Sequence, residues 1–289
     1  MSEINVFARH EIKYLIDYNQ RKLMEEAMKE YMTPDPHGQS TICNIYYDTP
    51  DYRLIRHSLE RPIYKEKIRL RSYGKVSSSD DVFLELKKKY HGIVYKRRIE
   101  ISESIATAYM SGKATEGTSL WLSDERDRQI AKEIDYFKSF YDSLAPRVYL
   151  CYDRCAYFSK TDPNLRLTFD RHIRWRNTDM SLTADPGGLD LLERGYSLME
   201  IKTAQGLPMW MVEILNKGNM KKASFSKYGK AYESILEFEK NQLKDNGKEL
   251  YNGYFISEHN DRNINSSKFY DKLGGGLGAG SNNGPGPIL

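Results

Sequence analysis

Four cations alternate with other residues in the segment YKEKIRLRSYG: Lys65, Lys67, Arg69 and Arg71. Successive side chains of a β-strand point to opposite faces, so these four cations would share one face of a strand. Like charges that are neighbours on one face repel each other unless an anion lies among them. The spacing therefore predicts a strand whose cationic face binds a polyanion.

Six further strand-like segments also place charged residues on one face. The charged sets are Arg9, Glu11 and Lys13; Glu85 and Lys87; Lys96, Arg98 and Glu100; Arg154; Arg166 and Asp170; and Glu200 and Lys202. Any one of these strands, taken alone, is explained as an amphipathic strand with its charge in solvent. Their agreement favours another arrangement, in which the charged faces point into a basic interior that contains a few carboxylates. Buried charge of this kind is costly unless it is paired, so such an interior would need water and an anion.

Phosphate chemistry accounts for both signs of charge. Arginine offers planar, bidentate donors to phosphoryl oxygens, whereas lysine offers a point charge. Carboxylates hold a divalent metal, often through only one or two side chains, with phosphates as further ligands. Phosphoryl transfer asks the protein mainly for positioning and charge neutralisation, so the lack of a Ser-His-Asp or Cys-His arrangement does not exclude it.

The elements that would position these residues follow from hydrophobic periodicity and turn signals. Strands are predicted at 6–16, 42–48, 63–73, 82–89, 93–101, 147–158, 165–176 and 197–203. Helices are predicted at 18–32, within 103–142 with a break near 112–117, at 208–216 and at 228–243. Residues 33–40 contain two prolines and a glycine, which predicts a turn.

Eight antiparallel strands are enough to close a small barrel. We therefore expect an α+β fold in which an eight-stranded antiparallel β-barrel carries flanking helices. One domain is expected over residues 1–245, followed by a C-terminal extension over 246–289. The glycine-rich stretch from about residue 274 is of low complexity and is expected to be a disordered tail.

Composition indicates which partners and which cellular compartment to expect for the protein. Net charge is only +4, so the placement of charge says more about partners than its total. Three cysteines without framework spacing favour a reducing compartment. No apolar run reaches the length that crosses a membrane, so we expect a cytoplasmic protein without a membrane segment of its own. The aromatic-rich segments could also stack nucleic-acid bases, but tyrosines such as Tyr46, Tyr47 and Tyr95 lie where barrel packing would use them, and we expect no nucleic acid.

Collinear segments of the chain resemble a known family. They are RHEIKYLI (9–16), IYYDT (45–49), KIRLRSYG (67–74), VFLELKKKYHGIVYKRRIEI (82–101), YDRCAYF (152–158), RLTFD (166–170), LMEIKT (198–203) and SFSKYGKAY (224–232). The family is the VTC-type polyphosphate polymerase domain of the triphosphate tunnel metalloenzyme (CYTH-like) superfamily. In the wider superfamily the first segment carries an E-x-E-x-K motif. Here its first position is Arg9, which favours the polymerase branch over simple triphosphatases.

The resemblance implies a tunnel that binds ATP and inorganic polyphosphate together with Mn²⁺ or Mg²⁺. Expected catalytic residues are Arg69, Arg71, Lys87, Arg154 and Glu200. Expected phosphate-binding residues are Lys13, Lys67, Lys96, Arg98, Arg166, Lys202 and Lys227. Expected metal ligands are Glu200, Glu11 and Glu85, with Asp170 as a further candidate.

Three functions stay open at this point. The first is a metal-dependent polymerase that transfers the terminal phosphoryl group of ATP to a growing polyphosphate chain. The second is a triphosphatase that hydrolyses triphosphate or nucleoside triphosphate, and the third is a polyphosphate-binding module without catalysis. A membrane protein partner is a further expectation, because related domains work inside a membrane complex.

Overall fold

The computed structural model describes residues 10–113, 122, 124–245, 248–251 and 254–257. The chain divides into two units, residues 1–236 and 237–289. The domain boundary expected at residue 245 stays a prediction, and the glycine-rich stretch from residue 274 lies outside the described residues. No helix in the described part of the chain is both long and apolar enough to span a bilayer.

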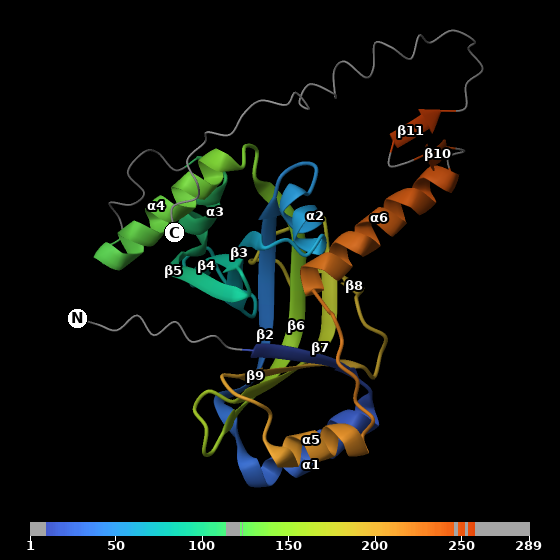
Figure 1. The fold of residues 1–289 in the computed structure, drawn as a ribbon. Coiled ribbons are helices and arrows are strands. Elements are labelled where there is room, and N and C mark those ends of the chain that lie inside the picture. Colours follow the sequence, from blue (N-terminus) through green and yellow to red (C-terminus); the bar gives the residue numbers. More distant parts are fainter. Residues whose placement is uncertain (1–9, 114–121, 123, 246–247, 252–253, 258–289) are drawn as a thin grey trace, which may run out of the picture. The chain divides into compact units, whose positions relative to one another are not determined.

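The first unit is built on one antiparallel sheet, in which nine strands are described (Figure 1). The strands are β1 (His10–Ile16), β2 (Met32–Asp48), β3 (Tyr64–Tyr73), β4 (Asp81–Tyr90), β5 (Ile93–Ser102), β6 (Ala145–Ser159), β7 (Arg166–Arg176), β8 (Leu189–Asp190) and β9 (Ser197–Thr203). Their order is β1-β9-β7-β6-β2-β3-β4-β5, and the short β8 pairs with β7. In this order, β1 from the start of the first unit pairs with β9 from near its end, and β9 pairs with β7 from its middle.

The β4–β5 hairpin shows how local sequence sets this register. Its loop is His91-Gly92, and both residues have positive φ (+45° and +85°). Two positive φ values at the centre of a two-residue loop match the twist of the flanking strands. The hairpin consequently sets Glu85 directly opposite Arg98, and Lys87 opposite Lys96.

Six helices are described in the chain. They are α1 (Tyr18–Tyr31), α2 (Arg53–Leu59), α3 (Glu103–Met110), α4 (Glu125–Phe140), α5 (Met209–Lys217) and α6 (Lys227–Asp245). The α1 helix begins with a capping box, in which Asp17 and Gln20 each bond the backbone N–H of the other. The α5 helix, predicted to begin with Pro208 as its first residue, begins one position later at Met209, with Pro208 as its N-cap.

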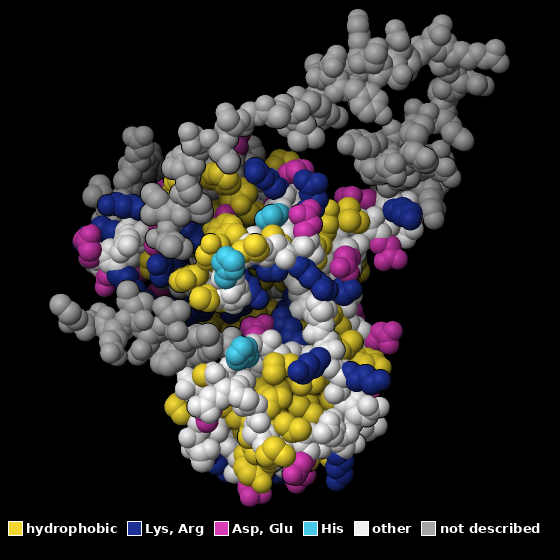
Figure 2. Space-filling model, in the orientation of Figure 1, with side chains coloured by type: hydrophobic (Ala, Val, Ile, Leu, Met, Phe, Trp, Pro, Cys, Tyr) yellow, Lys and Arg dark blue, Asp and Glu magenta, His cyan; other side chains and the backbone are white. Residues whose placement is uncertain are grey.

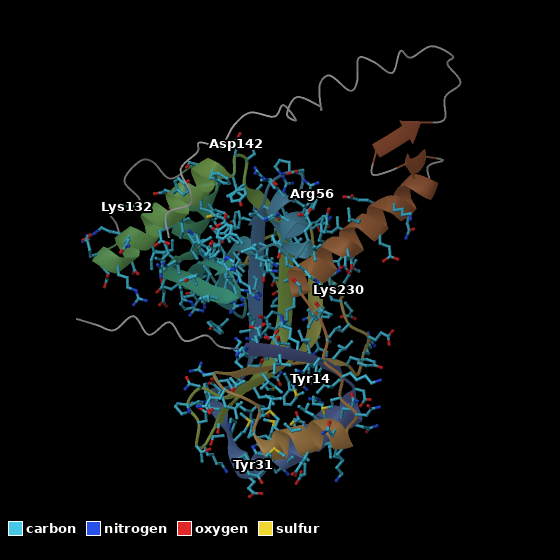
Figure 3. The ribbon with its side chains drawn as sticks, in the orientation of Figure 1. Tyr14, Tyr31, Arg56, Lys132, Asp142 and Lys230 are labelled. Atoms are coloured by element: carbon cyan, nitrogen blue, oxygen red, sulfur yellow. The ribbon has the colours of Figure 1, made fainter. Side chains whose placement is uncertain are left out.

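Helices cover the outer face of the sheet at two places. The α3 and α4 helices pack against β4 and β5, where Ile130, Ile134 and Phe137 of α4 are buried at helical spacing. The α1 and α5 helices lie side by side against β1, β7 and β9, and the Tyr31 ring at the end of α1 stacks on Trp210 at a centroid distance of 4.6 Å (Figures 1 and 3). These two layers bury the apolar sides of the strands, so the charged sides point the other way.

The expected closure of the barrel is wrong. In the described part of the chain, the hydrogen-bonded path ends at β1 and at β5, and these two strands do not pair with each other. The seam carries charge of both signs. Burial lowers the pKa of Lys202 of β9, and its surroundings include both Glu11 of β1, which raises this pKa, and Lys87 of β4, which lowers it. The described sheet therefore has two open edges, β1 and β5.

The turn expected at 33–40 is also wrong, because this stretch belongs to β2. Pro34 lies opposite Tyr157 and Gln39 lies opposite Cys155 on β6, with a register shift between the two pairs. An irregularity of this kind lets a strand accommodate prolines without breaking the sheet. Pairing with the long β6 strand thus overrides the local turn signals.

In the second unit, β10 (Lys248–Tyr251) pairs with β11 (Tyr254–Ser257) as an antiparallel hairpin.

Candidate functional site

The charged residues predicted to share faces do lie on one side of the sheet. We call this side the inner face, and its predicted members are Glu11 and Lys13 (β1), Glu200 and Lys202 (β9), Arg166 (β7), Arg154 (β6), Lys67, Arg69 and Arg71 (β3), Glu85 and Lys87 (β4), and Lys96 and Arg98 (β5). Figure 2 shows Lys and Arg side chains gathered in the hollowed middle of the first unit. The inner face carries two clusters of ion pairs and one cavity.

The first cluster surrounds Glu85, whose side chain is only 2% exposed. One carboxylate oxygen accepts from Arg69 at 2.7 and 2.8 Å, and the other accepts from Arg98 at 2.7 Å and pairs with Lys96 at 2.7 Å. Burial opposes ionisation of Glu85, but Arg69, Arg71 and Lys96 outweigh it and hold the pKa of Glu85 well below its usual range. Glu85 therefore stays ionised and fixes the two arginine side chains in place.

The second cluster joins Asp170 and Glu200. Asp170 is fully buried and accepts two bonds from Arg154, at 2.6 and 2.7 Å, and its carboxylate pairs with Lys227 at 2.5 Å. Glu200 lies 3.1 Å from Lys227 and 3.6 Å from both Lys13 and Arg154. Although burial opposes its ionisation, these three cations hold the pKa of Glu200 well below its usual range.

The start of α6 packs onto the inner face and brings Lys227 to the second cluster. Ser226 caps the helix, because its hydroxyl accepts from the backbone N–H of Gly229 at 3.1 Å. Lys13 Nζ donates to the carbonyl of Phe225 at 2.9 Å, and Lys67 Nζ donates to the Ser226 hydroxyl at 3.4 Å. Segment 225–227 is thus held by cations from two different strands.

Two further contacts fix the first turn of α6. The Tyr228 hydroxyl donates to the buried Asp48 at 2.7 Å, and its ring stacks on Tyr46 with centroids 4.6 Å apart. The same Asp48 accepts from the backbone N–H groups of Leu54 and Ile55 in α2. Figure 3 marks Lys230, which lies one turn further along α6 and is exposed.

A cavity of about 470 Å³ opens on the inner face beside the second cluster. Five predicted site residues line it: Arg71, Arg154, Arg166, Glu200 and Lys202. The other predicted residues of the inner face lie outside its lining, either in the first cluster or nearer to β1 and the start of β3. Asp35 lines the cavity as well, so the cavity combines four cations with two carboxylates, a composition suited to a phosphorylated ligand together with a cation.

Several polar groups of this site were not predicted as functional. The buried Asn44 accepts from Arg71 at 2.9 Å, and Tyr46 accepts from Arg69 at 2.9 Å. Burial opposes ionisation of Tyr46, but Arg69, Arg71 and Lys67 outweigh it and lower the pKa of Tyr46 to about 8. Alternation within segment 42–48 could have placed both residues on the inner face, since they stand two positions apart.

The carboxylates differ in how well they suit a metal ion. In the described residues, no three side chains of the His, Cys, Asp and Glu types are grouped as a metal site. Metal ions in phosphate sites need only one or two carboxylates, however. Glu11 and Glu200 converge on one cationic group, the Lys13 ammonium, at 3.1 and 3.6 Å. The hydroxyl of Thr168, opposite Glu200 on β7, is buried and has no hydrogen-bond partner within the described residues.

Cations surround both Glu200 and Glu85, but at different distances. Lys227, Lys13 and Arg154 lie 3.1–3.6 Å from Glu200, whereas Arg69, Arg98 and Lys96 lie at 2.7 Å from the oxygens of Glu85. The geometry of Glu85 therefore supports a metal ion less well than that of Glu200. Arg9 lies outside the described residues.

Comparisons with known proteins give the family of the chain. The family model for the VTC domain matches residues 8–236. Vacuolar transporter chaperone complex subunit 4 of Schizosaccharomyces pombe is 24% identical over 240 residues, which are 71% of this chain and 32% of that protein. The subunit of the same name from Trypanosoma brucei brucei is 27% identical over 219 residues, 65% of this chain and 28% of that protein. The chain thus spans about a third of the length of these relatives.

Solved structures of low identity also align with the chain. A candidate adenylate cyclase from Bacillus halodurans gives a TM-score of 0.45 at 13% identity, covering 76% of this chain and 95% of its own. A candidate adenylyl cyclase from Hippeastrum, described as having a dominant triphosphatase activity, gives a TM-score of 0.41 at 15% identity and covers 85% of this chain and 99% of its own. The family model matches residues 8–236, which are most of the chain, and the protein therefore belongs to the VTC domain family.

Proposed function

We propose that the protein is a metal-dependent polyphosphate polymerase, which transfers the terminal phosphoryl group of ATP to a growing chain of inorganic polyphosphate and releases ADP. The observation that carries the proposal is the cavity of the inner face, which is lined by Glu200, by Arg154 held by the buried Asp170, and by Arg71 held by the buried Asn44. Membership in the VTC domain family supports the same function.

The arginines are suited to hold phosphates without rearrangement. Asp170 fixes the Arg154 guanidinium with two bonds, and Asn44 fixes Arg71. Arg166 and Lys202 add two further cations to the cavity wall. Donors that are already oriented neutralise the charge of a transferred phosphoryl group without a cost of reorganisation at the moment of reaction.

Glu200 and Glu11 are the residues proposed to hold Mn²⁺ or Mg²⁺. A bound divalent ion would neutralise charge on neighbouring phosphate oxygens. Because the pKa of Glu200 lies well below its usual range, this carboxylate is ionised at neutral pH and ready to coordinate a cation. Lys13 lies between the two carboxylates and would keep them near each other before the metal binds.

The test is incubation of the purified chain with ATP and Mn²⁺, with long-chain polyphosphate followed on a gel and ADP measured in parallel. We expect chains with stoichiometric ADP, and loss of both in Glu200→Gln while binding of tripolyphosphate persists. Glu193→Gln is the matched control, because Glu193 is an exposed carboxylate outside the inner face. Unchanged metal-dependent turnover in Glu200→Gln would contradict the assignment of Glu200.

Two other results would replace the proposal. Orthophosphate as the sole product would identify a triphosphatase with the same inner face. Tight polyphosphate binding without turnover of ATP in Mn²⁺ or Mg²⁺ would identify a binding module.

A membrane protein partner is proposed from the relatives. Both compared relatives are named as subunits of a vacuolar transporter chaperone complex, and the chain covers about a third of each. Chemical cross-linking of the tagged chain in its native cells should recover it with a membrane protein. Recovery of the tagged chain alone would count against a stable partner.

A further inference from the structure

Two loops meet at one end of strands β3, β4 and β5. The loop before β3 ends at Ile63, and the hairpin between β4 and β5 turns at His91-Gly92. The backbone N–H of His91 donates to the carbonyl of Ile63 at 3.1 Å, which ties the two loops together. We call this end of the three strands the hairpin tip and define it as residues 61–65 and 88–94.

Large apolar side chains are exposed at the hairpin tip. Ile63 is 63% exposed and Val94 is 46% exposed, although side chains of these types are usually buried. The rings of Tyr64 and Tyr90, which stand opposite each other on β3 and β4, are exposed as well and lie 6.5 Å apart between centroids. Apolar exposure concentrated in one place marks an interaction surface.

Cations border these apolar side chains. They are Arg61 in the loop, Lys65 near the start of β3, and Lys88 and Lys89 near the end of β4. Within the described residues, no carboxylate oxygen lies within 4 Å of any of the four. Burial lowers the pKa of Lys65, and Lys89 and Arg61 lower it further, so the positive charges of the tip are close enough to repel each other.

The acidic residues beside the tip are engaged elsewhere. Glu60 lies 3.4 Å from His57 of α2. Glu66, which stands opposite Lys88, is buried and accepts from the Tyr64 hydroxyl at 2.5 Å. The hairpin tip therefore presents apolar side chains together with uncompensated positive charge.

This combination fits the surface of an anionic bilayer. Tyrosine has an apolar ring and a polar hydroxyl, which suits it to the boundary between lipid and water. The negative potential of an anionic leaflet attracts nearby lysines and arginines, and it would also relieve the repulsion among them. The apolar side chains extend from loops at the ends of strands, where they can enter the headgroup layer without a complementary groove.

We propose that the hairpin tip docks on an anionic phospholipid bilayer. Ile63 and Val94 enter the boundary between headgroups and acyl chains, while Arg61 and Lys88 contact the phosphates of the lipids. The contact is with the bilayer itself and needs no membrane protein. It does not rest on the proposed function, because none of these four residues belongs to the cavity or to the two ion-pair clusters.

The experiment measures sedimentation of the full chain with vesicles, either of phosphatidylcholine alone or of phosphatidylcholine and phosphatidylglycerol in about equal amounts. We expect binding to the anionic vesicles, and weaker binding at high salt because salt screens the charges. Ile63→Ser/Val94→Ser should lower the partition coefficient by about tenfold or more, because two apolar side chains no longer leave water. Leu189→Ser/Met209→Ser is the matched control, since both residues are exposed and lie outside the tip.

A second double variant, Arg61→Gln/Lys88→Gln, tests the electrostatic part. It should lower partition onto the anionic vesicles by about tenfold or more, because two cations near the lipid phosphates are lost. Its weak partition onto phosphatidylcholine alone should stay within about twofold of the unchanged protein. Lys217→Gln/Lys221→Gln, at exposed positions outside the tip, should bind like the unchanged protein.

The midpoint of thermal unfolding checks that every variant is folded. Absence of binding to the anionic vesicles, or equal losses in a tip variant and its control, would overturn the docking proposal. Self-association of the unchanged protein in sedimentation velocity, abolished in Ile63→Ser/Val94→Ser and without vesicle binding, would instead identify the tip as an interface between copies. Each of these results leaves the proposed function standing, because the polymerase assay contains no lipid.

Discussion

Glu85→Gln separates a structural role of this carboxylate from a metal-binding one. The substitution keeps the shape of the side chain but removes the charge that Arg69, Arg98 and Lys96 share. Breaking a buried ion pair from one side costs about 3–5 kcal/mol, because the remaining charges stay desolvated. The three cations keep 21–44% exposure of their side chains, so we expect the low end, about 3 kcal/mol of unfolding free energy at neutral pH.

The assay is urea-induced unfolding at several pH values. The pKa of Glu85 is lower in the folded protein than in the unfolded chain, so its stabilisation is complete above about pH 4.3 and is lost as the pH falls toward its folded value. The difference between the unchanged protein and Glu85→Gln should therefore shrink in acid. Glu100→Gln serves as the control and should stay within about 0.5 kcal/mol, because Glu100 is an exposed carboxylate of β5.

A loss below about 1 kcal/mol, or a loss that does not change with pH, would refute the reasoning. If Glu85 instead binds the metal ion, the variant should keep its stability and need more Mn²⁺ for turnover. Tripolyphosphate should also stabilise Glu85→Gln more than the unchanged protein, since it would offer a new anion to the freed arginines.

Two further predictions concern the start of α6 and its neighbours. The affinity for long-chain polyphosphate should fall between about pH 7 and about pH 9, because Lys67, whose pKa is about 8, loses its proton in this range. Arginine stays protonated there, so calorimetry should show a smaller fall in affinity for the Lys67→Arg variant. An equal fall in both proteins would contradict the role of Lys67. Tyr228→Phe should lower the free energy of unfolding, measured in urea, by about 1–2 kcal/mol, because the buried Asp48 loses one hydrogen-bond donor. Tyr136→Phe is the control and should have no measurable effect, because Tyr136 is exposed.

The composition of the inner face could be predicted from sequence because alternation along a strand is a local property. Lys67, Arg69 and Arg71 share a face in any regular strand that contains them. Glu85 and Arg98 could be paired as well, since a short hairpin joins their strands. Side-chain alternation and short turns therefore predict the contacts between strands that a hairpin joins.

Contacts between distant segments could not be predicted in this way. Lys227 reaches Asp170 only because α6 returns to the inner face, and nothing in either segment indicates the other. The α2 helix was not predicted, because seven residues are too few to show a helical period, and its first turn depends on Asp48 for a cap. The open seam between β1 and β5 could not be predicted either, because alternation along single strands does not determine whether the first and last strands of a sheet pair.

The first turn of α6 also bears on the order in which the protein folds. Its bonds join residues far apart in the chain: Lys13 to Phe225 across 212 positions, Asp48 to Tyr228 across 180, and Lys67 to Ser226 across 159. Contacts of such high sequence separation form slowly, because the entropy of closing long loops is lost before the contacts are made. During synthesis, every strand of the first unit leaves the ribosome before this turn does. A nascent chain can therefore assemble its sheet early, but Asp170 and Glu200 receive Lys227 only after the start of α6 has emerged.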